Sequence, residues 1–153
     1  MISNIKIKTI NKEISSIVID EPKTYNSLSF QNLLDLLKAL KKLDVDKNVK
    51  VIILEGSGKG FSAGHNLKEV RGLKQKAKYQ KLFNLCSKVM LQIVEGRKPV
   101  IAKVHGAAFA AGCQLVASCD LAYSTKEALF ATPGVNIGLF CSTPMVAVSR
   151  KIN

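Results

Sequence analysis

Hydrophobic and polar residues alternate along the first part of the chain with the period of a half-buried strand. Residues 5–9 read Ile-Lys-Ile-Lys-Thr, and residues 14–20 are strand-like again after a polar break at residues 11–13. This arrangement predicts a β-hairpin at the start of the chain. A loop that contains a proline and an asparagine, residues 21–29, follows it.

Two longer stretches show the spacing of amphipathic helices. The first is expected to have Ser29 as its N-cap and to end at residues 44–48, with a leucine stripe formed by Leu33, Leu36, Leu37 and Leu40. The second is expected over residues 74–95, and Gly96 and Pro99 close it. Its buried stripe is expected to consist of Leu82, Leu85, Cys86, Val89 and Ile93.

The remaining apolar segments predict the other elements of a single domain over residues 1–153. Strands are expected over residues 49–54, 99–104 and 120–123, an extended segment over 135–139, and helices over 113–118 and 143–151. Helices of crossover length separate the strands. The expected fold class is therefore α/β, with a mainly parallel sheet and helices packed outside it.

Composition narrows the class of protein. With 47% hydrophobic residues in 153, the chain has enough apolar surface for a folded core, which excludes disorder. The longest stretch of small or apolar residues, 106–113, is far too short to cross a membrane, so no membrane partner is expected. Residues 1–6 lack the patterns of a secretory signal and of a transit peptide. We therefore expect a cytoplasmic protein, or a mitochondrial matrix protein if the source is eukaryotic.

The cysteines and histidines argue against a metal site. Cys86, Cys113, Cys119 and Cys141 form no CxxC pair, and the chain has only two histidines. Each cysteine lies among apolar or small residues, as buried free thiols do in reducing compartments.

The chain is strongly basic, with 23 Lys and Arg against 11 Asp and Glu and a formal charge of +12. Residues 68–103 hold ten basic residues and two acidic ones. This excess predicts an anionic partner, such as a phosphorylated ligand or nucleic acid. A solvated, lysine-rich surface explains the same excess equally well.

Three segments rich in glycine or alanine could expose backbone groups to a ligand: residues 60–69, 104–115 and 130–134. Small residues let a ligand approach the backbone, and N–H groups at a helix start have no partner within the helix. Two such donors that meet at one point form an oxyanion hole. Taken singly, each segment is also explained as a tight structural turn.

Together these segments resemble the crotonase superfamily, the enoyl-CoA hydratase/isomerase family, nearly from end to end. The landmarks are Glu21-Pro22-Lys23 with Asn26, Phe61-Ser62-Ala63-Gly64 leading to Leu67-Lys68-Glu69, Pro99-Val100-Ile101-Ala102, Gly106 with Ala110-Ala111-Gly112-Cys113, Cys119-Asp120, and Phe130 with Pro133. The resemblance implies a crotonase-like spiral of ββα units, of which this chain holds the N-terminal core. Since family members are longer, it also implies a domain that is incomplete at its C-terminus. The full-length protein would form a homotrimer or hexamer.

The resemblance implies an acyl-CoA thioester as the partner, with no separate cofactor because coenzyme A is part of the substrate. The thioester oxygen would accept hydrogen bonds from the backbone N–H groups of His65 and Ala111. Substrate contacts are expected from Lys23, Tyr25, Ala63, His65, Asn66, Leu67, Phe109, Ala111, Gly112, Pro133 and Gly134. Lys23 and the basic residues within 68–81 are candidates for contacts with the CoA phosphates.

Two departures from the family pattern bear on the chemistry. Hydratases of the family have glutamates at the positions of Gln114 and Gly134. Neither residue here can transfer a proton as a carboxylate does, and such general acid–base catalysis contributes about 10²–10⁴-fold per group. Ordinary water addition is therefore not expected, whereas stabilisation of a thioester enolate by the oxyanion hole remains.

Few side chains could replace these two acids. The ring of His65 could act as an acid or base, although the oxyanion role needs only its N–H. Cys113 and Cys141 have no adjacent histidine, so nucleophilic catalysis is not expected. The other candidates are expected to be structural or solvated: a capping or surface carboxylate at Glu69, a solvated Glu127, and structural roles for His105 and Asp120.

Two alternatives to an enzyme stay open. A non-catalytic CoA-ester-binding or assembly module agrees with Gln114 and Gly134. RNA binding through the basic face is the weaker alternative, because Tyr79 and Phe83 are expected on or near the buried stripe of their helix. That placement leaves no aromatic platform among the lysines.

Overall fold

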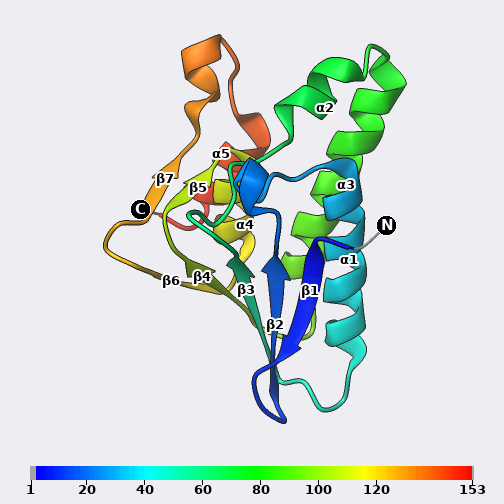
Figure 1. Cartoon of the computed structure of the whole chain (residues 1–153), viewed down its shortest axis with the longest axis vertical. Coiled ribbons are helices and arrows are strands. Elements are labelled where there is room, and N and C mark those ends of the chain that lie inside the picture. The colour runs from blue at the N-terminus through cyan, green and yellow to red at the C-terminus, as the bar shows by residue number, and fades with distance from the viewer. Residues whose placement is uncertain (1–2, 153) are drawn as a thin grey trace.

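The computed structural model describes residues 3–152 and has the α/β architecture that the sequence predicts (Figure 1). The expected hairpin is confirmed: β1 (Ile5–Thr9) pairs antiparallel with β2 (Ile14–Ile19). Strand β2 is buried along most of its length, because it is the second strand of a sheet that continues on its other side.

The main sheet has five strands in the order β1-β2-β3-β4-β6. Beyond the hairpin, β3 (Val51–Gly56), β4 (Val100–Val104) and β6 (Leu121–Ser124) are joined by parallel pairing, as predicted. Ile17, Leu54 and Ala102 form one register row across the central strands, and all three side chains are fully buried. The centre of the core is therefore aliphatic.

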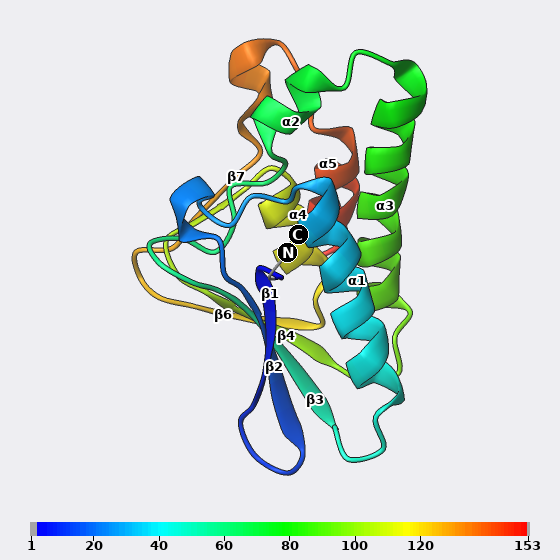
Figure 2. The ribbon, with the colours of Figure 1, turned by 45° about the vertical axis from the view of Figure 1, so that its right-hand side comes forward.

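Two long helices, α1 (Phe30–Val45) and α3 (Lys76–Val94), lie side by side against the sheet (Figure 2). The Ser29 hydroxyl accepts a hydrogen bond from the Asn32 N–H, which confirms the predicted N-cap of α1. The predicted stripe of α3, residues 82, 85, 86, 89 and 93, is buried. These apolar faces close the core on the helical side of the sheet.

A smaller layer completes the fold. A two-stranded parallel sheet pairs β5 (Ala107–Phe109) with β7 (Leu129–Ala131). Helix α4 (Ala111–Ser118) follows β5 directly, and α5 (Ser142–Ser149) packs on α4. The sequence predicts both helices but not this sheet, because the Ala- and Gly-rich residues of β5 carry no alternating pattern.

Three further expectations differ from the structure. The segment 135–139 is not extended: residues 135–137 belong to the 3₁₀ helix η2 (Pro133–Ile137) and Gly138 caps it, since Pro133 favours the first turn of a helix. A separate helix, α2 (Leu67–Gly72), precedes α3, and Lys74 breaks the chain between them with a φ of +50°. Phe83 is 46% exposed rather than part of the buried stripe of α3, and Tyr79 is only half-buried.

Large apolar side chains are exposed along β6, β7 and η2, at one edge of the molecule. They are Leu121, Tyr123, Leu129, Phe130, Val135, Ile137, Leu139 and Phe140. We call this set the apolar edge. Within residues 3–152, no helix has both the length and the hydropathy needed to cross a bilayer.

Candidate functional site

The glycine-rich segment that leaves β3, residues 57–66, is held in place by Asn26; we call this segment the glycine loop. The Asn26 side chain is fully buried, and its amide nitrogen donates to the carbonyl oxygens of Ser57 (2.7 Å) and Gly60 (2.8 Å). Its amide oxygen accepts a 2.9 Å hydrogen bond from the Glu21 N–H. The loop therefore starts from a fixed position.

The glycine loop then runs beside the segment that enters α4. The N–H groups of Phe61 and Ser62 donate to the Ala107 carbonyl oxygen at 2.9 and 3.0 Å, and the Phe109 N–H donates to the Ser62 carbonyl oxygen at 2.9 Å. Two segments far apart in the sequence thus form a short parallel pairing just before α4 begins.

Two glycines allow this approach. A Cβ on Gly112 would stand 2.2 Å from the Ser62 carbonyl oxygen. A Cβ on Gly64, whose φ is +88°, would stand 3.1 Å from the Ala111 backbone nitrogen. A side chain at either position would push the segments apart. The close contact places His65, the residue after Gly64, beside the first turn of α4.

The backbone N–H groups of His65 and Ala111 are both unpaired. Within residues 3–152, neither donates a hydrogen bond. Ala111 is the first residue of α4, so its N–H has no partner inside the helix and lies at the positive end of the helix dipole. Unpaired donors on two adjoining segments are the arrangement that an oxyanion hole requires.

The residue before Ala111 has a strained backbone. Ala110 adopts φ +48° and ψ −118°, a conformation that costs a residue with a Cβ about 1–3 kcal/mol. Its N–H donates to the Ala131 carbonyl oxygen at 2.9 Å, which helps to hold this geometry. The turn at Ala110 places the first residues of α4 against the glycine loop.

The His65 ring is enclosed by the protein. Its Nδ1 lies 3.3 Å from the Leu28 carbonyl oxygen, and the ring stands edge-on to Phe83 of α3, with 5.2 Å between ring centroids. Burial lowers the pKa of His65 below its usual value of 6.5 and outweighs the opposing effect of the hydrogen bond to Leu28. The imidazole is therefore neutral at pH 7. Sequence periodicity places Phe83 on or near the buried stripe of α3 and gives no sign of this contact.

The other residues expected at the site divide into two groups. Tyr25, Ala63, Phe109 and Gly112 belong to the glycine loop and the segments that pair with it: the Ala63 N–H, for example, donates to the Tyr25 carbonyl oxygen at 2.9 Å. The second group lies outside these segments. Lys23 is exposed on the 3₁₀ helix η1 (Pro22–Thr24), Leu67 is 68% exposed at the start of α2, and Pro133 and Gly134 begin η2.

Asn66, the remaining expected contact, serves as the N-cap of α2. Its side-chain oxygen accepts hydrogen bonds from the N–H groups of Lys68 (3.1 Å) and Glu69 (3.2 Å). This cap fixes the direction in which the chain leaves His65.

Gln114 and Gly134 are the two residues that the resemblance aligns with the glutamates of hydratases. Gln114 is buried on α4, and its amide oxygen accepts a 3.2 Å hydrogen bond from the Thr143 hydroxyl of α5. A Cβ on Gly134 would stand 2.5 Å from the Leu139 carbonyl oxygen and 2.7 Å from the Cys141 Sγ. The backbone around Gly134 therefore has no room for any side chain.

The carboxylates that could have replaced these acids either accept hydrogen bonds from backbone N–H groups or are exposed to solvent. Glu69 accepts a 2.9 Å hydrogen bond from the Phe30 N–H, and Asp120 accepts one of 2.8 Å from the Val100 N–H. Glu127 is exposed on the turn before β7. His105, the second histidine, places its Nε2 2.9 Å from the Gly58 carbonyl oxygen. The structural roles expected for Glu69, Asp120 and His105 agree with these bonds.

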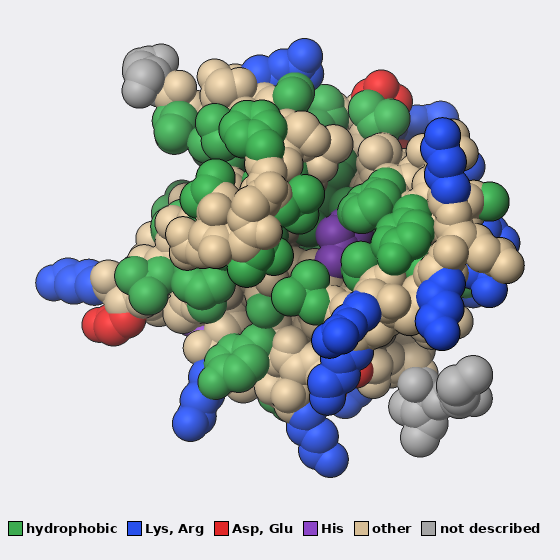
Figure 3. Space-filling model, turned by 90° about the horizontal axis from the view of Figure 1, so that it is seen from above, with side chains coloured by type: hydrophobic (Ala, Val, Ile, Leu, Met, Phe, Trp, Pro, Cys, Tyr) green, Lys and Arg blue, Asp and Glu red, His purple; other side chains and the backbone are tan. Residues whose placement is uncertain are grey.

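The upper end of the molecule carries a hollow with a histidine side chain at its floor (Figure 3). Hydrophobic side chains border the hollow, and Lys and Arg side chains stand along one side. No ion pair of residues 3–152 involves the basic residues within 68–88. They therefore keep their full charge for an anionic ligand.

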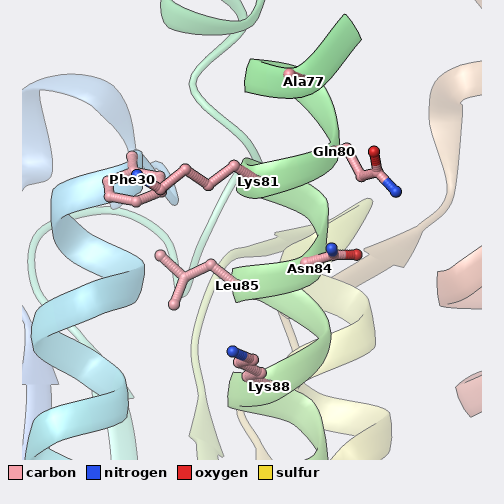
Figure 4. A pocket seen from close by; sticks show the side chains of 7 residues that line it. All are labelled: Phe30, Ala77, Gln80, Lys81, Asn84, Leu85 and Lys88. Carbon is pink, nitrogen blue, oxygen red and sulfur yellow. The ribbon is translucent and has the colours of Figure 1, made fainter.

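A second hollow, of about 370 Å³, lies between α1 and α3 (Figure 4). The Lys81 Nζ stands 5.6 Å from the centre of the Phe30 ring across the gap. The other lining residues are Ala77, Gln80, Asn84, Leu85 and Lys88. Of the residues expected at the site, Lys81, a candidate for contact with the CoA phosphates, lines this hollow, and the expected contacts of the thioester do not. Among residues 3–152, no three His, Cys, Asp or Glu side chains gather as metal ligands would.

Comparison with known proteins decides the family. The family model described as enoyl-CoA hydratase/isomerase matches residues 9–152. The chain belongs to the enoyl-CoA hydratase/isomerase family.

Individual relatives of this family agree. The human mitochondrial enoyl-CoA hydratase domain-containing protein 3 is 49% identical over 143 residues, which is 91% of this chain and 46% of the relative. Its counterpart in Xenopus laevis is 46% identical over 139 residues, covering 91% of this chain and 47% of the relative.

A solved enoyl-CoA hydratase structure from Mycobacterium smegmatis superposes with a TM-score of 0.94 at 45% identity, covering 98% of this chain and 58% of that one. The expected crotonase fold is thereby confirmed. The chain spans about half the length of the curated relatives that it matches.

Proposed function

We propose that the protein binds an acyl-CoA thioester, with the thioester oxygen between the backbone N–H groups of His65 and Ala111. The observation that carries this proposal is the contact of Gly64 with Ala111, which brings two unpaired donors together. Both donors are fixed before a ligand arrives, so they stabilise the negative charge of an enolate oxygen without reorganisation.

The reaction that fits the site is enolate stabilisation rather than water addition. Hydration needs groups that deprotonate water and protonate carbon. Gln114 is a hydrogen-bonded amide, and Gly134 has no space for a side chain. The oxyanion donors are unaffected by both differences, and removal of one such donor costs about 2.7–4 kcal/mol of transition-state stabilisation in enzymes that depend on it.

The charge around the site suits coenzyme A. We place the phosphates of the ligand near Lys23 and the basic residues of α2, of the connection after it and of the start of α3, namely Lys68, Arg71, Lys74, Lys76, Lys78 and Lys81. These side chains act as mobile point charges and not as a shaped phosphate site, so salt should weaken the binding.

The relatives bear on the cellular compartment of the protein, and the apolar edge bears on its oligomeric state. The enoyl-CoA hydratase domain-containing protein 3 relatives are named as mitochondrial, which supports the mitochondrial alternative and gives no support to the cytoplasm. An exposed apolar surface such as the apolar edge marks an interface. We propose that it lies within a homo-oligomer, the trimer or hexamer expected for the family. Light scattering that found a stable monomer at high protein concentration would contradict this.

Calorimetric titration with butyryl-CoA tests the binding site. Ala111→Pro deletes one donor at the first position of α4, where proline is tolerated best. Ala111→Gly keeps the N–H and is the matched control. We expect Ala111→Pro to abolish binding and Ala111→Gly to retain it, with circular dichroism as a check of folding. Equal affinity of both variants would refute the proposed site.

A non-catalytic binding module is the second candidate function. It is favoured by the Thr143–Gln114 hydrogen bond and the closed space at Gly134, which together leave no carboxylate for hydration. Turnover of crotonyl-CoA beside the binding titration separates the two candidates. Binding without conversion of any acyl-CoA would establish the module.

A further inference from the structure

Strand β1 forms an open edge of the main sheet (Figure 1). It is the first strand in the order and pairs only with β2. The Asn4 carbonyl oxygen and the Ile10 N–H both take part in this pairing, at 2.7 and 2.9 Å. Backbone groups alternate in direction along an antiparallel pair, so the even-numbered residues of β1 face β2. The N–H and carbonyl groups of Ile5, Ile7 and Thr9 therefore face outward.

One of these three residues is closed within the chain. The Ser3 hydroxyl bonds to both the Ile5 N–H (3.1 Å) and the Ile5 carbonyl oxygen (3.3 Å). Within residues 3–152, the outward groups of Ile7 and Thr9 have no partner. The strand contains no proline, and its register with β2 runs without a bulge. Two donors and two acceptors are thus open to a further strand.

A hollow of about 240 Å³ lies beside this edge, between β1 and α1. Ile5 and Ile7 line it from the strand, and Ala39 and Lys42 line it from the helix. Ile7 pairs with Ile17, which is fully buried beneath the helices, so the Ile7 side chain points to the helical side of the sheet. Every second side chain of a strand added to β1 would point to the same side and meet the hollow.

The charges at this edge are mainly positive. Lys6 and Lys38 are paired with acids of the chain, whereas Lys8 and Lys42 have no ion-pair partner within residues 3–152. Asp35, which also lines the hollow, is the acid that pairs with Lys38. A second copy of β1 would bring its own lysines beside these, and like charges on neighbouring strands repel. The same lysines attract an acidic strand, so they select the partner.

We propose that β1 is the docking edge for an extended segment of a partner protein in which acidic and aliphatic residues alternate. Ile7 and Thr9 exchange main-chain hydrogen bonds with this segment. Its aliphatic side chains enter the hollow against α1, and its acidic side chains stand on the other face, beside Lys8. Main-chain bonds supply the affinity, and the hollow and the charges supply the specificity. The inference does not depend on the proposed binding of acyl-CoA.

The test uses a fluorescein-labelled peptide, acetyl-Glu-Val-Glu-Leu-Glu-Val-Glu-amide, and follows its anisotropy with the whole chain. Thr9→Pro deletes one outward N–H, and proline is tolerated at an edge position whose N–H faces solvent. Thr9→Val keeps the N–H and is the matched control. We expect Thr9→Pro to weaken binding by about tenfold and Thr9→Val to bind like the parent. Lys8→Glu should also weaken binding, and the peptide with lysine in place of every glutamate should not bind.

Hydrogen exchange measured by nuclear magnetic resonance locates the peptide. The Ile7 and Thr9 amides should exchange fast in the free protein and slowly in the complex, whereas the Lys6 and Lys8 amides, which face β2, should be protected in both. Absence of binding, equal affinity of Thr9→Pro and Thr9→Val, or equal binding of the lysine peptide would overturn the proposal. Protection of Ile7 and Thr9 that rose with protein concentration alone would also overturn it, because a second copy would then occupy the edge.

Discussion

The Glu69 carboxylate of α2 accepts a 2.9 Å hydrogen bond from the backbone N–H of Phe30, the first residue of α1. Ser29 already caps the same helix through the Asn32 N–H, so two side chains satisfy two of its unpaired donors. The bond also ties the helix that follows His65 to the long helix on the outside of the sheet. Glu69 is therefore a capping residue and not a spare acid of the site.

Glu69→Ala should lower the free energy of unfolding by about 0.5–2 kcal/mol, as loss of a capping group does. Urea denaturation measures this loss. Glu127→Ala, at an exposed carboxylate, is the control and should leave the midpoint unchanged. If Glu69→Ala left stability intact but abolished conversion of acyl-CoA, Glu69 would have to be a catalytic acid or base.

Asn26→Ala should destabilise the protein much more. The change leaves the carbonyl oxygens of Ser57 and Gly60 and the Glu21 N–H without their buried partner, and each such group costs about 1–3 kcal/mol. Alanine is also disfavoured at the φ of +56° found here. Thermal unfolding should show a large drop, whereas exposed Asn48→Ala should show almost none. Equal melting temperatures would mean that the glycine loop does not depend on Asn26.

Ala110→Gly should stabilise the protein, by roughly 1 kcal/mol, because glycine adopts φ +48° and ψ −118° without the strain that a Cβ introduces. Glycine is normally harmful inside a helix, so Ala117→Gly in α4 should destabilise by a comparable amount. Opposite signs of the two changes in melting temperature are expected. A loss of stability in both variants would show that Ala110 is not strained.

Only one of the two positions, Gln114, should accept a glutamate without loss of the fold. Gln114→Glu should fold, because its neighbour Thr143 can donate to a carboxylate as it does to the amide. Gly134→Ala should unfold at a markedly lower temperature than the parent, because its Cβ would stand 2.5 Å from the Leu139 carbonyl oxygen. Gly134→Glu, which adds a longer side chain, should lower the unfolding temperature further.

Gly72→Ala provides the matched comparison, since a Cβ on Gly72 meets nothing within 4 Å, and it should be neutral or stabilising. Crotonyl-CoA hydration should stay near background in the parent and in each variant. Robust hydration by the unmodified chain would refute this expectation and require another acid.

Thiol labelling should separate the cysteines. Burial raises the pKa of the Cys86 and Cys119 thiols to about 12, so at pH 8 almost none of either is the reactive thiolate. Cys141 is the half-buried cysteine, and the other three are buried. Mass spectrometry after iodoacetamide treatment should find Cys141 modified first and Cys86 and Cys119 only in urea. Early modification of Cys86 would show that α3 opens in the native protein.

The helices and strands with a regular spacing of hydrophobic residues could be predicted from the sequence. The segments whose conformation depends on tertiary contacts could not. Leucine spacing and Ser29 located α1 correctly, and the apolar runs located β3 and β4. The segment after Pro133 has no period that separates an extended chain from a 3₁₀ turn. Its conformation is set locally by Pro133 at the start and Gly138, with φ +74°, at the end.

The site shows the same division. The glycines at 64 and 112 marked the segments that meet, because only a missing side chain permits such an approach. The orientation of the His65 ring depends on Leu28 and Phe83, which lie on two other elements. No spacing rule connects these residues, so that contact becomes visible only in the folded chain.

The pairing of the glycine loop with the segment before α4 also governs the order in which the chain can fold. The β1–β2 hairpin is local and can form as soon as both strands exist, but each parallel pair must wait for the helix that separates its strands. Ser62 meets Phe109 only after α3 and β4 have been made. During synthesis on the ribosome, the glycine loop therefore emerges long before its partner. Until then the N–H groups of Phe61 and Ser62 and the Ser62 carbonyl oxygen lack their partners.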